Sequence, residues 1–84
     1  MKYCLITFRS VTPAQRAEGM LKKAGLDCHI QRTPRWMEEQ GCGYSLRLRP
    51  ADIPAAVQLL RQNNAQFIKV YFKRENGSFE EMTL

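Results

Sequence analysis

Hydrophobic and polar residues repeat with two different periods along the chain, and these periods predict four strands and two helices. A strand is expected over residues 2–8, where β-branched and aromatic side chains are concentrated. A short second strand is expected over residues 28–32. A third is expected over residues 44–48, where tyrosine and leucine alternate with serine and arginine, so that one face is buried and the other solvated. Residues 66–73 alternate in the same way and predict a fourth strand.

The two segments between these strands have apolar residues at helical spacing. We expect the first helix to have Thr12 as its N-cap, Pro13 at its first position, and Gly25 as its stop. Its apolar stripe comprises Ala14, Ala17, Leu21 and Ala24. The second helix should begin after Asp52, a capping residue, and end at Asn63.

This order of elements predicts an α+β fold, specifically a ferredoxin-like β-α-β-β-α-β sandwich with two helices on one face of an antiparallel sheet. Right-handed crossover connections then make the first two strands parallel. The end of the first strand, the start of the first helix and the loop over residues 33–41 must therefore lie at the same end of the sheet. This arrangement brings Arg9, Ser10 and Thr12 close to that loop.

The C-terminal residues predict a fifth strand. Asn76-Gly77 is a strong signal for a two-residue hairpin turn. Folding about this turn sets Lys73 opposite Glu80 and Tyr71 opposite Met82. The added strand would cover the fourth strand, which is otherwise an exposed sheet edge.

Length and composition limit the architecture and the location. With 84 residues, 44% of them hydrophobic and 25% charged, the chain is expected to be one globular domain over residues 1–84. We divide it into a core over 2–72 and a C-terminal hairpin extension over 73–84. Its apolar runs are too short to span a membrane, and its first residues lack a signal-peptide pattern. Three cysteines without a Cys-x-x-Cys pair then indicate reduced thiols in a cytoplasmic protein.

Cys42 lies between Gly41 and Gly43, and no other position is as well suited to chemistry. Flanking glycines leave a thiol unshielded and allow another molecule to approach closely. Two interpretations stay open: an accessible, reactive thiol, or an incidental cysteine at the glycine-bounded start of a strand. Near the start of the first helix, unpaired N–H groups and partial positive charge would favour the thiolate and lower the pKa of the thiol.

The remaining candidate residues divide into one anion-binding residue and two structural thiols. Arg35 would hold an anionic group beside Cys42, or it is a solvated loop arginine. Cys28 and His29 are adjacent, so they face opposite sides of a strand and cannot bind one metal together. The cysteines and the histidine also lack a zinc-binding spacing, and we expect no metal site. Cys4 and Cys28 are expected to pack in the sheet.

Three motifs resemble those of a known family. They are Lys2 to Ser10 (Lys-Tyr-Cys-Leu-Ile-Thr-Phe-Arg-Ser), Thr33-Pro34-Arg35, and Cys42-Gly43 followed by Leu46-Arg47. On these motifs the chain resembles the putative selenium/sulfur carrier protein-like family over residues 2–72. Where that family has a serine-rich stretch before its Cys-Gly pair, this chain has the bulkier and more acidic Trp36-Met37-Glu38-Glu39-Gln40.

The resemblance implies a sulfur or selenium carrier in preference to an enzyme. Cys42 would hold a persulfide- or selenide-type adduct as a thiolate carrier and deliver it to a partner enzyme. The implied partners are donor and acceptor proteins, and the only bound group would be the adduct on Cys42. The candidate binding residues around this thiol are Arg9, Ser10, Thr12, Pro34, Arg35, Gly41 and Gly43.

Two other functions are kept as alternatives. One is a non-catalytic protein-interaction or dimerisation module, with the open face of the sheet as the surface for a homodimer. The other is RNA binding, because RNA-recognition domains share this architecture. The open face would carry Arg47, Arg49, Lys69, Tyr71 and Lys73. However, the third strand lacks their aromatic motif and the basic residues behind the net charge of +5 form no run, so nucleic acid is not the expected partner.

Overall fold

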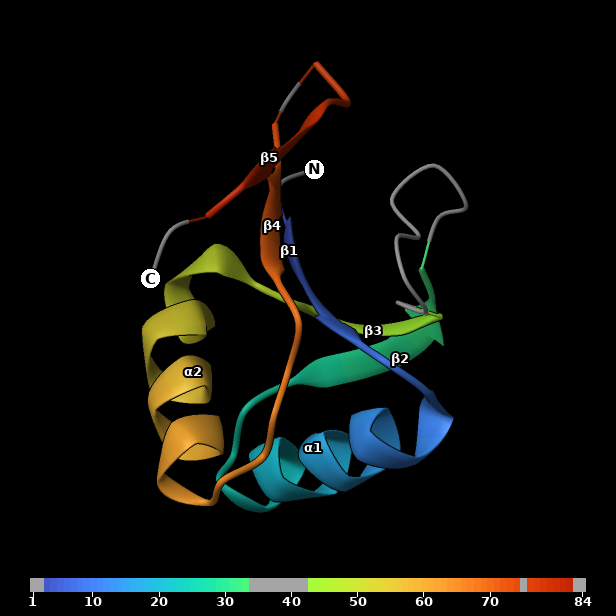
Figure 1. Cartoon of the computed structure of the whole chain (residues 1–84). Coiled ribbons are helices and arrows are strands. Elements are labelled where there is room, and N and C mark those ends of the chain that lie inside the picture. The colour runs from blue at the N-terminus through green and yellow to red at the C-terminus, as the bar shows by residue number, and fades with distance from the viewer. Residues whose placement is uncertain (1–2, 34–42, 75, 83–84) are drawn as a thin grey trace.

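The computed structural model describes residues 3–33, 43–74 and 76–82. These residues form five strands, two α-helices and one 3-10 turn (Figure 1). In chain order the elements are β1 (Tyr3–Phe8), α1 (Val11–Lys23), β2 (Cys28–Arg32), β3 (Tyr44–Leu48), the 3-10 turn (Pro50–Asp52), α2 (Ile53–Gln62), β4 (Val70–Lys73) and β5 (Phe79–Glu81).

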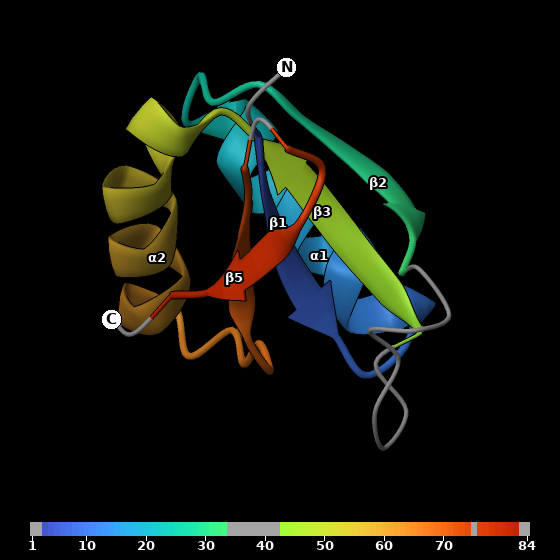
Figure 2. The same cartoon turned by 90° about the horizontal axis from the view of Figure 1, so that it is seen from above.

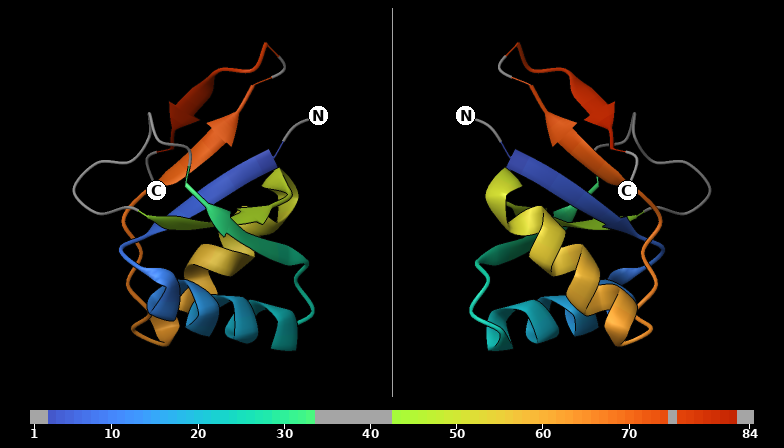
Figure 3. Two further views of the ribbon diagram at one scale, coloured as in Figure 1. Left: turned by 90° about the vertical axis from the view of Figure 1, so that its right-hand side faces the viewer. Right: turned by 90° about the vertical axis from the view of Figure 1, so that its left-hand side faces the viewer.

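The strands form one five-stranded antiparallel sheet in the order β2-β3-β1-β4-β5. Both helices lie on one side of this sheet, as the two side views in Figure 3 show. Because β1 and β2 are each antiparallel to β3, they run in the same direction, as the right-handed crossover predicted. The predicted α+β class is therefore confirmed, with a fifth strand at the outer edge of β4.

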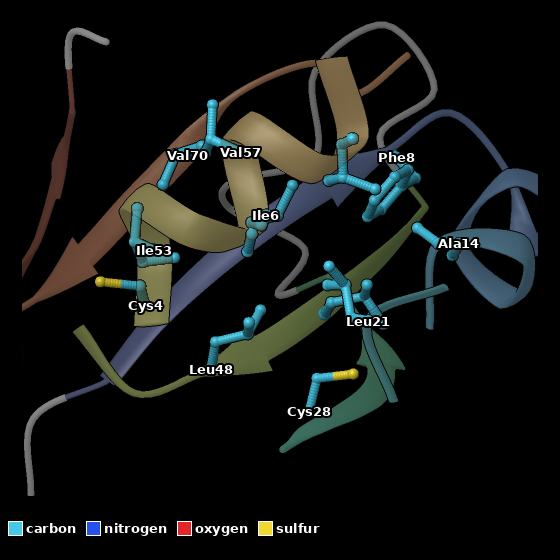
Figure 4. Packing of buried hydrophobic residues seen from close by; sticks show 14 residues of the cluster. Cys4, Ile6, Phe8, Ala14, Leu21, Cys28, Leu48, Ile53, Val57 and Val70 are labelled. Atoms are coloured by element: carbon cyan, nitrogen blue, oxygen red, sulfur yellow. The ribbon is translucent and has the colours of Figure 1, made fainter. Parts of the chain in front are cut away.

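The core fills the space between the sheet and the helices (Figure 4). Alternate residues of β1 point into it, which is the period that a strand with one core-facing side requires. Helix α1 contributes Ala14, Ala17 and Leu21, so the predicted apolar stripe is confirmed for these three residues. Ala24 lies beyond the last helical residue and is exposed.

Helix α1 starts earlier than the sequence predicted. Ser10 is the N-cap, with an extended backbone and no capping hydrogen bond from its side chain. Thr12 and Pro13 lie within the first turn, so the prediction of Thr12 as the N-cap is wrong. Proline is tolerated there because N–H groups of the first turn have no acceptor within the helix.

Helix α1 is terminated by Gly25, as predicted. This glycine has φ +86, a left-handed conformation that side chains disfavour. Its N–H donates to the Lys22 carbonyl at 3.0 Å, and the next N–H, of Leu26, donates to the Leu21 carbonyl at 2.9 Å. These two bonds form a Schellman motif, which satisfies carbonyls that the helix end would leave unpaired.

The start of α2 combines a correct and an incorrect expectation. Asp52 occupies the N-cap position, as predicted, but its side chain makes no capping hydrogen bond. Instead its carboxylate accepts a hydrogen bond from Arg49 Nε at 3.2 Å. The helix ends at its C-cap Asn63 as predicted, and Asn64 follows with φ 55.

The face of β3 that points away from the helices is solvated only in part, so the prediction holds for Arg47, which is partly exposed, and fails for Ser45. Ser45 on this face is fully buried, and so is Leu5 on the same face of β1. Both strands are internal to the sheet. On this face Leu5 has Arg47 on one side and Tyr71 on the other, and long neighbouring side chains shield a smaller residue between them.

Strand β4 starts at Val70, four residues later than predicted, because Thr7 interrupts the regular pairing. The N–H of Thr7 donates to the Lys69 carbonyl, and its own carbonyl accepts from the Ile68 N–H, both at 2.8 Å. The Thr7 hydroxyl accepts from the Lys69 N–H at 3.0 Å and donates to the Lys69 carbonyl at 3.2 Å. Two residues therefore lie opposite one, which is the definition of a β-bulge.

The predicted fifth strand is present, but its turn holds three residues and not two. The Gly77 N–H donates to the Arg74 carbonyl at 3.0 Å, and the Arg74 N–H donates to the Ser78 carbonyl at 2.8 Å. Gly77 has φ +89, as expected for the last residue of a three-residue hairpin loop.

The longer turn shifts the pairing of β5 by one residue. The predicted pairs of Lys73 with Glu80 and of Tyr71 with Met82 are therefore wrong. The observed partners are Phe79 for Lys73, Glu80 for Phe72 and Glu81 for Tyr71. Opposite charges still meet, because Glu80 pairs with Arg74 and Glu81 lies 3.3 Å from Lys69 Nζ.

Candidate functional site

One end of the sheet gathers the described residues that the sequence grouped around the candidate thiol. Phe8 at the end of β1 and Arg32 at the end of β2 both pair with Tyr44 at the start of β3. One residue further along, the Thr33 N–H donates to the Gly43 carbonyl at 3.1 Å. Seen from above in Figure 2, this end lies where β1 leads into α1. The expectation that these chain ends share one end of the sheet is confirmed.

Arg9, Ser10 and Thr12 follow directly from β1 at this end, and all three are exposed. Since Ser10 is the N-cap of α1, the first N–H groups of the helix open toward the same region. The first turn contains no acidic residue, so its partial positive charge is not neutralised by a side chain of the turn. This end of the protein therefore favours an anionic group.

The sequence-predicted site residues Pro34, Arg35, Gly41 and Cys42 lie outside the described residues. Gly43, the neighbour of Cys42 in the sequence, is described and partly buried. Their proposed roles stay predictions.

The other two cysteines are shielded thiols. Cys4 and Cys28 are fully buried on the helix side of the sheet, as Figure 4 shows. Burial raises the pKa of Cys4 to about 11. The pKa of Cys28 is also raised, first by burial and then by the carboxylate of Glu18. Near neutral pH both groups are therefore protonated, and a protonated thiol is a poor nucleophile.

The positions of Cys4 and Cys28 also separate their thiols from each other and from the end of the sheet at which Gly43 lies, which we call the Gly43 end. Cys4 and Cys28 both pair with Leu48, from opposite sides of β3. Two strand spacings put their Cα atoms about 10 Å apart, too far for a disulfide. The four residue steps from Tyr44 to Leu48 add a distance of about 13 Å along β3. Neither thiol is placed to react with a group held at the Gly43 end.

Two buried hydroxyls at this end were not anticipated from the sequence. Thr33 is 5% exposed and Ser45 is fully buried. Among the described residues neither Thr33 Oγ1 nor Ser45 Oγ has a hydrogen-bond partner. The signal that could have revealed Ser45 is its place in an internal strand, where longer side chains of the two neighbouring strands can shield a small residue.

Neither a metal centre nor a bilayer-crossing helix is found in the described ranges. Within residues 3–33, 43–74 and 76–82, no three His, Cys, Asp or Glu side chains gather in a metal-binding arrangement. Across those same ranges the helices are too short and too polar to cross a lipid bilayer.

These observations define a small α+β protein with two shielded thiols in its sheet and one end that favours an anionic group. A family model described as "Putative Se/S carrier protein-like" matches residues 3–72, and the chain belongs to that family. The resemblance drawn from the sequence motifs is thereby confirmed. Comparisons with curated proteins and with solved structures return no significant match. The family match ends within β4, so β5 lies beyond it.

Proposed function

We propose that the protein is a sulfur or selenium carrier that holds its cargo on Cys42 and delivers it to a partner enzyme. The observation that carries the proposal is that the chain belongs to a carrier-like family while Cys4 and Cys28 are buried and protonated near neutral pH. Of the three thiols in the sequence, Cys42 is then the one left to act as a nucleophile.

The surroundings of Gly43 support a thiolate in this region. Gly43 is bonded to Cys42 in the sequence and lies at the end of the sheet where α1 begins. The helix N-terminus carries partial positive charge, and Arg9 adds a full charge beside it. Arg35, with Pro34 and Gly41, is proposed to complete the binding site together with Ser10 and Thr12. Exposed positive charge of this kind lowers the pKa of a nearby thiol.

The transfer itself is a thiol exchange that needs no oxidant. The Cys42 thiolate attacks the outer sulfur of a donor protein's persulfide, and a bond forms between Cys42 Sγ and that sulfur. The sulfur–sulfur bond of the donor breaks, and the donor leaves as a thiolate with the electron pair. Delivery repeats the step in the other direction, since the acceptor's nucleophile takes the outer sulfur and Cys42 is released as a thiolate. A donor that carries selenium in place of the outer sulfur gives the selenium adduct by the same exchange.

A carrier must also keep its adduct until the acceptor arrives. A second thiol in reach would attack the persulfide, form a disulfide and discharge the cargo. The distance of Cys4 and Cys28 from the Gly43 end, and their raised pKa values, support an adduct that survives inside this protein.

The test is intact-mass analysis of protein purified from its native host without reductant. We expect a fraction heavier by one sulfur or one selenium atom, with the extra mass on the peptide that contains Cys42. The Cys42→Ser variant should lose this fraction and keep its fold. The Cys28→Ala variant is the matched control, because it also removes one thiol yet should keep the adduct.

A second measurement tests the reactivity of the thiols directly. Iodoacetamide near neutral pH should label Cys42 much faster than Cys4 or Cys28 in the folded protein, and all three alike in denaturant. If the three thiols react alike in the folded protein, or if Cys42→Ser still carries the adduct, the carrier function is wrong. A non-catalytic interaction module would then be the better description.

A finer description of the fold accompanies this proposal. We propose that β1 to β4 and the two helices form a ferredoxin-like sandwich to which β5 is an addition. The element order and the arrangement β2-β3-β1-β4 within the sheet support this description.

A further inference from the structure

The sheet face opposite the helices carries a cluster of aromatic and basic side chains, which we call the platform. It consists of Tyr3, Arg47, Lys69, Tyr71, Lys73 and Phe79, all partly exposed. Register places five of these residues side by side on β3, β1, β4 and β5, and Lys69 directly precedes β4. Lys73 is opposite Tyr3 on one side and Phe79 on the other, while Leu5 separates Arg47 from Tyr71.

The rings and cations of the platform are in contact with one another. The Arg47 guanidinium lies 4.1 Å from the centre of the Tyr3 ring, and Lys73 Nζ lies 5.1 Å from it. Phe79 meets the same ring edge-on, with 6.1 Å between ring centres. A guanidinium at this distance over a ring is held by cation–π attraction. The platform therefore offers a charged, aromatic surface whose side chains hold one another in place.

Positive charge dominates this face. Three basic residues, Arg47, Lys69 and Lys73, share it with Glu81, which lies 3.3 Å from Lys69 Nζ. A second acid, Asp27, lies 3.7 Å from His29, the β2 residue opposite Arg47. The other described acids belong elsewhere: Glu18 is in α1, Asp52 begins α2, and Glu80 is opposite Phe72 on the other face. A partner that fits the platform is therefore anionic, and it also carries groups that pack against the aromatic rings.

We propose that the platform binds single-stranded RNA. Unpaired bases stack on aromatic rings and on guanidinium planes, and phosphates pair with lysine. A single RNA strand therefore engages both the aromatic and the basic side chains of the platform. The hydroxyl groups of Tyr3 and Tyr71 can in addition hydrogen-bond the ribose 2′-hydroxyl, which DNA lacks. A second copy of the chain fits less well, because facing platforms would bring three cations against three cations.

The sequence argued against RNA because the third strand lacks the aromatic motif of RNA-recognition domains, and the predicted face held Tyr71 as its aromatic residue. The structure adds Tyr3 from β1 and Phe79 from β5 to the same face. These two rings come from strands outside the β3 segment in which the RNA-recognition motif is sought. Arg49, which the sequence placed on this face, instead pairs with Asp52.

RNA binding here is separate from the carrier function. Tyr3 is at the start of β1, whereas Phe8, next to the Gly43 end, is at its finish. An RNA strand bound over Tyr3 and Lys73 therefore contacts the opposite end of β1 from the one at which Gly43 lies. The Cys42→Ser variant should bind RNA like the unmodified protein, so that loss of one function is distinguishable from loss of the other.

The test is fluorescence anisotropy with a labelled oligouridylate of about 12 nucleotides. Arg47→Gln and Lys73→Gln should each weaken binding about fivefold or more, and each should lower the slope of log K against log salt by about 0.7. Tyr71→Leu should weaken binding with an unchanged salt slope, because it removes a stacking surface and no charge. Lys23→Gln, on the last turn of α1, removes the same charge from the helix side and should change affinity less than about twofold. Far-UV circular dichroism checks that each variant is folded.

Three results would overturn the proposal. Equal losses of affinity for Lys23→Gln and Lys73→Gln would show that RNA is attracted by the charge of the whole protein and is not bound by the platform. Equal or tighter binding of an oligothymidylate of the same length, measured beside the oligouridylate, would assign the face to DNA. Concentration-dependent dimerisation that Arg47→Gln abolishes, with no RNA binding, would assign the face to a second copy of the chain.

Discussion

The carboxylate of Glu18 in α1 accepts a hydrogen bond from the backbone N–H of Ile30 in β2, with 3.2 Å between Oε2 and N. Strand β2 is an edge of the sheet, and this N–H points away from β3, whose bonds with β2 use the neighbouring residues. An unpaired edge donor is a site for pairing with a foreign strand. Helix α1 thus blocks part of that edge with one of its own side chains.

Removing this acceptor should cost stability. We expect Glu18→Ala to lower the free energy of unfolding by about 1–3 kcal/mol, because a partly buried N–H loses a charged acceptor. Glu18→Gln keeps an oxygen acceptor and should cost less. Lys22→Ala is the control: its ion pair with Glu18, at 3.6 Å, is on the surface and should contribute below about 1 kcal/mol. Urea denaturation measures all three variants, and a larger effect for Lys22→Ala would contradict the prediction.

Two glycines should respond to alanine in opposite directions. Gly77→Ala should destabilise the protein by about 1 kcal/mol, because its φ of +89 is unfavourable for any side chain. Gly19→Ala lies within α1, where an added Cβ meets nothing within 4 Å, and should stabilise by about 0.5–1 kcal/mol. Thermal unfolding of the two variants, measured side by side, gives the sign of each change. Changes of the same sign would show that the turn conformation is wrong.

The buried hydroxyls of Thr7 and Ser45 should contribute differently to the stability of the protein. Thr7→Val removes a hydroxyl that both accepts from and donates to Lys69, and should cost about 1–3 kcal/mol. Ser45→Ala removes a buried hydroxyl that has no partner among the described residues, and should be neutral or slightly stabilising. Denaturant unfolding distinguishes them. A large loss for Ser45→Ala would reveal a partner for that hydroxyl.

The pH dependence of stability should show the buried thiol of Cys4. Burial raises the pKa of Cys4 in the folded state from 9.0 to about 11. Between these values the unfolded chain loses the proton while the folded protein keeps it, so stability falls as pH rises. Below pH 9.0 both states are protonated and the effect vanishes. The Cys4→Ala variant should therefore show a shallower decline over this range in urea titrations, and an identical decline would refute the shift.

The sequence predicts an element of the fold more reliably when several residues contribute to the pattern than when a single residue does. Apolar periodicity identified both helices and the strand over residues 44–48, since several residues contribute to each pattern. Single-residue signals were less consistent: Gly25 ends α1 as predicted, but the N-cap was misplaced. Thr12 has a capping side chain, but Ser10 two residues earlier competes with it and lies closer to the end of β1. The register of β5 depended on turn length alone, and one extra residue displaced every pair.

The candidate site was predictable in its topology and not in its chemistry. Handedness alone brought the end of β1 and the start of β3 together. The pKa values of Cys4 and Cys28 depend on burial among distant residues, such as Met82 with its sulfur 3.9 Å from Cys4 Sγ, and no local pattern contains that information. The open face was predicted with Arg47, Lys69, Tyr71 and Lys73 but without Tyr3 and Phe79, because these two rings come from strands at the two ends of the chain.

The outer strand β5 has a consequence for the wider family, because the family match ends before it begins. A relative that stopped after β4 would leave that strand's donors and acceptors unpaired along the sheet edge. Its counterpart of Cys4 would also lack the covering side chain that Met82 provides here. Such a chain would complete its sheet most simply by pairing with another molecule. In this protein the short hairpin covers β4 within one molecule.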